Sequence, residues 1–72
     1  MKWYSKYKHP DGLRLEIKDG GNVGFYGIVY DVAKNKTYDY LQDDLDTVKQ
    51  FLFKKFQVPE DSWVEADEEF SK

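Results

Sequence analysis

Apolar and polar residues alternate along much of the first 41 positions, with the two-residue period of a β-strand that buries one face. The alternation is regular over residues 3–9 and again over 13–18. Residues 23–32 and 37–41 are rich in aromatic and β-branched side chains, which favour two further strands. The pattern predicts a four-stranded antiparallel meander.

Three short segments separate these strands and have the composition of turns: 9–12 (HPDG), 19–22 (DGGN) and 33–35 (AKN). If each turn is tight, His9 pairs with Leu13, Lys18 with Val23, and Val32 with Lys36. This register predicts one face covered by a helix, with Trp3, Tyr7, Leu13, Leu15, Ile17, Tyr26, Ile28, Tyr30, Tyr38 and Tyr40. It predicts an opposite face that carries Lys2, Tyr4, Lys6, Lys8, Arg14, Glu16, Lys18, Phe25, Gly27, Val29 and Leu41.

Residues 43–57 change to the period of an α-helix. Leu45, Val48, Leu52 and Phe56 fall on one stripe at about 100° per residue, which suits packing on a sheet. An aspartate at position 43 or 44 can cap the first turn, and Pro59 ends the helix, because the residue before a proline disfavours helical backbone.

We therefore expect an α+β fold in which a four-stranded antiparallel meander is packed on one face by a single helix (β-β-β-β-α), over residues 1–58. Residues 59–72 form an acidic C-terminal segment with two interpretations. It is a solvated, partly disordered end, or it docks on the domain. A docked segment has two alternatives: residues 59–62 start a short helix, or residues 63–66 instead pair as an edge strand.

Composition narrows the chemistry. The chain of 72 residues has no cysteine, which excludes disulfides and thiolate metal sites, and its one histidine, His9, precedes a turn proline. No apolar run approaches the roughly 20 residues of a membrane span, and the N-terminus does not resemble a signal peptide. We expect a cytoplasmic protein with no catalytic residues, no metal and no cofactor.

Charge is distributed unevenly along the chain, whose net charge is −3. Residues 1–18 carry five basic and two acidic side chains, whereas residues 58–72 carry six acidic side chains and one lysine. Such an asymmetry indicates a charged partner, or contact between the two ends of the chain.

These observations predict a small protein-binding module, a monomer or weak homodimer, that inhibits or regulates a protein partner by surface occlusion or nucleic-acid mimicry. Small acidic domains without cysteine are common among phage-encoded inhibitors, which is an analogy of composition and not a family motif. The predicted contact residues combine the uncovered sheet face with the acidic segment: Tyr4, Phe25, Val29, Trp63, Asp67, Glu68, Glu69 and Phe70.

The alternative is a domain that binds single-stranded nucleic acid on the same sheet face. Aromatic side chains would stack on bases while cations follow the phosphates. The cations in question are Lys6, Lys8, Arg14 and Lys18. The overall negative charge opposes this alternative.

Overall fold

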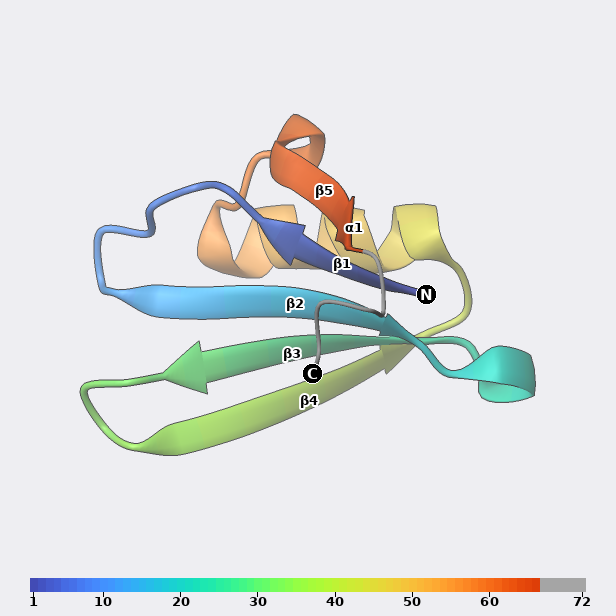
Figure 1. Ribbon diagram of the computed structural model, residues 1–72, viewed down its shortest axis with the longest axis horizontal. Helices are drawn as coiled ribbons and strands as arrows, with labels where there is room; N and C mark the ends of the chain where they lie inside the picture. Colours follow the sequence, from blue (N-terminus) through green and yellow to red (C-terminus); the bar gives the residue numbers. More distant parts are fainter. Residues whose placement is uncertain (67–72) are drawn as a thin grey trace.

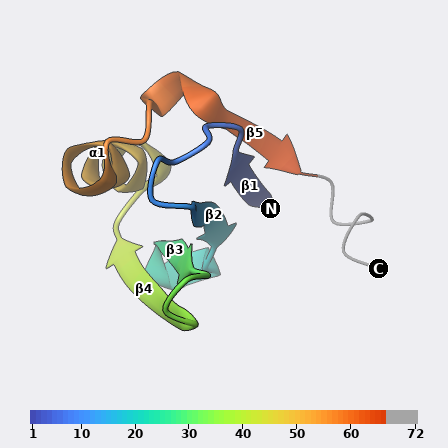
Figure 2. The same cartoon turned by 90° about the vertical axis from the view of Figure 1, so that its left-hand side faces the viewer.

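The computed structural model describes residues 1–66, which form a five-stranded antiparallel sheet with one α-helix packed on one face (Figure 1). The strand order is β4-β3-β2-β1-β5, and the sheet curves around the helix (Figure 2). The elements are β1 (Lys2–Ser5), β2 (Leu13–Asp19), β3 (Phe25–Asp31), β4 (Lys36–Gln42), α1 (Leu45–Phe56) and β5 (Trp63–Ala66). Short 3-10 turns occupy Gly21–Val23 and Glu60–Ser62.

The predicted α+β class and the single helix are confirmed, but the sheet has five strands and not four. The additional strand, β5, comes from the C-terminal segment and pairs antiparallel with β1, from Ser5 opposite Trp63 to Lys2 opposite Ala66. The edge-strand interpretation of residues 63–66 is thus correct. The chain reaches β5 after the helix, and β5 then pairs with the edge of β1, which a meander alone would leave unpaired.

The helix begins and ends as its sequence indicates. The Asp44 carboxylate accepts a hydrogen bond from the Thr47 backbone N–H at 2.8 Å and caps the first turn. At the other end Gln57 adopts the left-handed conformation (φ 60°), and its N–H donates to the Phe53 carbonyl at 2.8 Å. Val58 then turns into the core, where it is fully buried.

The core lies between the sheet and the predicted stripe of the helix. Its buried members come from β2, β3, the helix and the residue after it: Leu15, Ile17, Val29, Val48, Leu52 and Val58. The helix lies close above Gly27, because a Cβ built on this residue would lie 3.0 Å from Val48 Cγ2 and 3.3 Å from Leu52 Cδ1. The helix therefore packs directly on the backbone of β3.

The predicted register of β3 is wrong by an odd number of residues, which reverses its faces. Leu15 pairs with Val29 and not with Tyr26, because the β2–β3 connection contains the 3-10 turn and is longer than a tight hairpin. Phe25 and Val29, which we expected on the uncovered face, therefore lie on the helix face, and Val29 is fully buried. Tyr26, Ile28 and Tyr30, which we expected on the helix face, point to the opposite side.

The first hairpin also differs from the prediction. Trp3 pairs with Ile17, a shift of two residues that leaves every side chain on its expected face. However, β1 ends at Ser5 instead of continuing to His9. Residues 6–12 run away from β2 and then turn back to its first residue (Figure 1). We call residues 6–12 the arm.

Candidate binding surface

The uncovered side of the sheet, which we call the open face, is set by cross-strand pairing. Direct partners point to the same side, so Tyr4, Glu16, Ile28 and Asp39 form one row across β1 to β4. Val64 of β5 extends this row beyond Tyr4. Figure 2 shows that the helix lies against the other side of the sheet.

Two further rows flank the first. Lys2, Lys18, Tyr26 and Leu41 are successive partners on one side of it, and Arg14, Tyr30 and Thr37 are successive partners on the other. The open face therefore has an aromatic and aliphatic centre mixed with charges of both signs. Its apolar members are Tyr4, Tyr26, Ile28, Tyr30, Leu41 and Val64, of which Tyr4 is 44% and Leu41 50% exposed.

Charged neighbours on this face act on Tyr30. Partial burial, followed by the negative charges of Glu16 and Asp39 and a hydrogen bond to Glu16, raises the pKa of the Tyr30 hydroxyl above 10.0, against the opposing effect of Arg14. Tyr30 thus remains a neutral hydroxyl at physiological pH. It offers a partner an aromatic ring with a polar tip, a combination that suits protein interfaces.

The fold places the predicted site residues in different parts of the molecule. Tyr4, Arg14 and Lys18 lie on the open face, whereas Lys6 and Lys8 are exposed on the arm. Phe25 and Val29 turn inward, as the register of β3 requires. Asp67, Glu68, Glu69 and Phe70 lie outside the described residues.

Trp63 takes part in the fold. Its ring packs against the core from β5, on the helix side of the sheet. Its indole Nε1 is buried and has no hydrogen-bond partner within residues 1–66, which is an energetic cost to the fold. Trp63 is therefore a structural residue in the described part of the chain.

Sequence reasoning missed the three central residues of the open face, Tyr26, Ile28 and Tyr30. One signal was available, because Gly20, Gly21 and Gly24 together permit a connection longer than a four-residue turn. Gly24 has a φ of 122°, and a Cβ there would collide with the Gln42 carbonyl. This glycine allows β3 to start in the observed register.

Both ring nitrogens of His9 are already engaged. Nδ1 accepts a hydrogen bond from the Asp11 N–H at 3.1 Å, so the neutral ring carries its proton on Nε2, which donates to the Phe56 carbonyl at 2.9 Å. His9 thereby holds the arm against the end of the helix.

Residues 1–66 hold no group of three His, Asp or Glu side chains arranged for a metal ion.

Comparison with known protein families, with curated proteins and with solved structures finds no match. Within the described part of the chain, no helix has the length and apolar character needed to cross a membrane.

Proposed function

We propose that this chain is a non-catalytic protein-binding module whose contact surface is the open face. The observation that carries the proposal is the orientation of β3, which turns Tyr26, Ile28 and Tyr30 away from the helix. Tyr26, Ile28 and Tyr30, with Leu41 beside Tyr26, form an aromatic and aliphatic patch with polar tips between charged neighbours, a composition that suits a protein interface. Covering a partner's surface in this way would inhibit or regulate it by occlusion.

The arrangement of charge favours a protein partner over nucleic acid. Glu16 and Asp39 flank Ile28 directly in the central row, so a phosphate backbone laid across that row would meet two carboxylates. Tyr4, Arg14 and Lys18 supply the stacking ring and cations of the alternative, a single-stranded nucleic-acid binder. Such a strand would have to avoid the centre of the patch.

Affinity capture from the source cells tests the proposal, with the immobilised wild type compared with Ile28→Lys. Lysine at position 28 lies between Glu16 and Asp39, so the sheet tolerates the charge while the apolar centre is lost. We expect the captured protein to be lost with Ile28→Lys. Phe53→Asp is the control, because Phe53 is 47% exposed on the helix, and this variant should retain the partner.

Equal capture by Ile28→Lys and the wild type would contradict a contact through the open face. Fluorescence anisotropy with labelled single-stranded oligonucleotides addresses the alternative function. We expect no saturable binding; an isotherm that weakens steeply with salt and is reduced by Arg14→Glu would favour the nucleic-acid binder.

A further inference from the structure

The hydrogen-bonded ladder between β1 and β2 is incomplete. It ends at Tyr4 opposite Glu16, although β2 begins three residues earlier, at Leu13. Over Leu13–Leu15, β2 is paired with β3 on one side, whereas the β1 ladder ends before these residues; continuing its register places Ser5, the last residue of β1, opposite Leu15. An interior strand of the sheet thus has a short stretch of open edge.

Backbone hydrogen bonds at the other end of β2 show which groups point to this edge. The Asp19 N–H donates to the Met1 carbonyl on the β1 side at 3.0 Å, whereas the Gly20 N–H donates to the Gly24 carbonyl on the β3 side at 2.7 Å. Successive residues of a strand alternate, so Leu13 and Leu15 direct their N–H groups toward the β1 side. These are the donors that an added strand would use.

The arm is held away from this edge by bonds to other elements. The Lys6 N–H donates to the Ser62 carbonyl at 2.9 Å and the Tyr7 N–H to Ser5 Oγ at 3.1 Å, while the Gly12 N–H closes a turn within the arm by donating to the His9 carbonyl at 2.9 Å. The His9 ring adds its bond to the end of the helix. Closing the arm onto β2 would break several of these contacts, so the gap is preformed.

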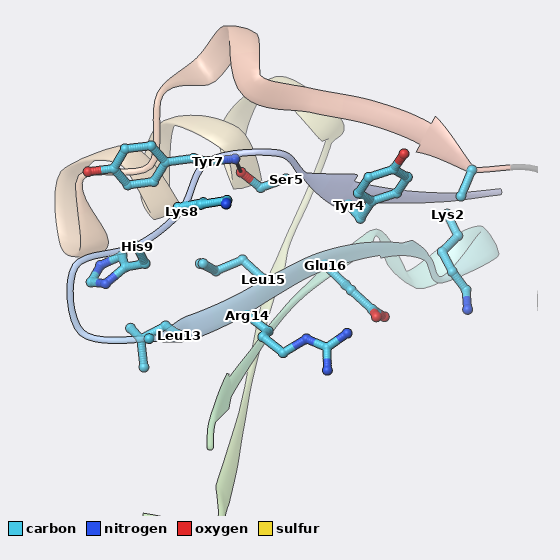
Figure 3. Close-up of a pocket in the computed structure, with 12 residues that line it drawn as sticks. Lys2, Tyr4, Ser5, Tyr7, Lys8, His9, Leu13, Arg14, Leu15 and Glu16 are labelled. Atoms are coloured by element: carbon cyan, nitrogen blue, oxygen red, sulfur yellow. Dashed lines mark hydrogen bonds between the residues drawn. The ribbon is translucent and has the colours of Figure 1, made fainter. Parts of the chain in front are cut away.

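A cavity of about 540 Å³, which we call the notch, begins between the arm and this edge and extends along Tyr4 and Glu16 to Lys2 and Ala66. Its volume is within the range of ligand-binding pockets. Figure 3 shows Tyr7, Lys8 and His9 on one side of it, and Leu13 and Leu15 on the other. The walls thus combine apolar side chains with an unpaired strand edge.

The charge around the notch is predominantly positive. Lys2, Lys8 and Arg14 line it together with a single carboxylate, that of Glu16. Within residues 1–66 these three cations form no ion pair. Lys2 also lies directly opposite Lys18 in the ladder, a like-charge pair that a bound anion would relieve.

We propose that the notch binds an extended, acidic peptide segment of a partner protein, which adds a short strand to Leu13–Leu15 of β2. Backbone hydrogen bonds to the open edge would hold the segment, and its carboxylates would lie beside Lys8 and Arg14. The site borders the open face, with which it shares Lys2, Tyr4, Arg14 and Glu16, but it does not depend on Ile28.

Titration of the ¹⁵N-labelled protein with the peptide Ac-Glu-Val-Glu-Val-Glu-NH₂ tests this site by NMR. We expect saturable shifts and slower amide exchange at Leu13 and Leu15. The same peptide with N-methylated valines, and the analogue with lysine in place of glutamate, should each bind about tenfold more weakly or worse. These losses would separate backbone pairing from charge.

Protein variants provide matched controls. Arg14→Glu should weaken binding of the glutamate peptide by about tenfold, whereas Lys34→Glu, an equal charge change in the β3–β4 turn, should leave it unchanged. Ile28→Lys should also retain binding, so that failure of the open face and failure of the notch are distinguishable.

Absence of saturable shifts at Leu13 and Leu15, or equal binding of the N-methylated peptide, would overturn the proposal. Amides at these positions that are already protected in the free protein would overturn it as well. Protection that falls on dilution would assign the edge to a second copy, and protection independent of concentration would assign it to the chain's own residues.

Discussion

At the scale of single residues, Asp44 controls where the helix starts. Hydrogen bonds from the Thr47 hydroxyl and then from its backbone N–H favour the charged carboxylate and lower the pKa of Asp44 below its ordinary 3.8. Asp46 lies in the same first turn, and Lys54 and Lys55 lie in the last, where each complements the helix dipole. The cap is the specific part of this pattern, since it selects one aspartate of the adjacent pair at 43 and 44.

We predict that Asp44→Ala lowers the free energy of unfolding at neutral pH. Because the pKa of Asp44 is lower in the folded state, its contribution to the free energy of unfolding is fully present at pH values above its ordinary pKa. This contribution is lost as the pH falls through the lowered pKa. Urea denaturation at a series of pH values should show the two proteins converging in acid. Asp43→Ala is the control, and an equal loss of stability in that variant would contradict the assignment of the cap.

At the scale of elements, the packing of α1 on β3 depends on the absence of a side chain at Gly27. Val48 and Leu52 lie over that position, and both are fully buried. The register of β3 places this glycine beneath the helix while it turns the neighbouring Ile28 outward. One strand thus supplies both the helix contact and the centre of the open face.

We predict that Gly27→Val destabilises the fold by about 2 kcal/mol, because the added methyl groups overlap Val48 and Leu52. Chemical denaturation of the single variants and of Gly27→Val combined with Val48→Ala measures the coupling. The double variant should lose less than the two single variants together, because the smaller alanine makes room. Strict additivity would show that the helix does not contact β3 at this position.

At the scale of the whole molecule, β5 ties the C-terminal segment to the first strand of the sheet. The Ser5 and Ser62 hydroxyls lie 2.8 Å apart, and the Lys6 N–H bonds to the Ser62 carbonyl, so the connection continues beyond the ladder. Trp63 brings a large ring to the same edge of the core. Residues up to Ala66 should therefore unfold together with the meander and the helix.

We predict that Trp63→Ala costs about 3 kcal/mol, a large part of the roughly 5 kcal/mol available to so small a domain. Trp63→Phe should cost clearly less, since it also removes the buried, unpaired Nε1–H. Circular dichroism should report one cooperative urea transition in each variant. Substitution of Glu65 by alanine, at an exposed position of the same strand, is the control. A Trp63→Ala protein with the stability of the wild type would show that β5 is not part of the cooperative unit.

Local sequence determined most elements of this protein. The helical stripe from Leu45 to Phe56, the turn at 9–12 and the left-handed Asn35 follow from short-range preferences that tertiary contacts did not override. Tyr4, Arg14 and Lys18 were placed correctly on the uncovered face for the same reason, since the alternation within β1 and β2 determines their side.

Only the tertiary structure decided how these elements align. The pairing of Leu15 with Val29 depends on the geometry of the β2–β3 connection, and a change of one residue in the count exchanges the two faces of a strand. Phe25 and Ile28 are both apolar, so composition could not say which of them faces the helix. The notch arises because the arm bonds to Ser62 and Phe56, residues about 50 positions away in the sequence. Hydrophobic periodicity reports only local structure, so it cannot predict such long-range contacts.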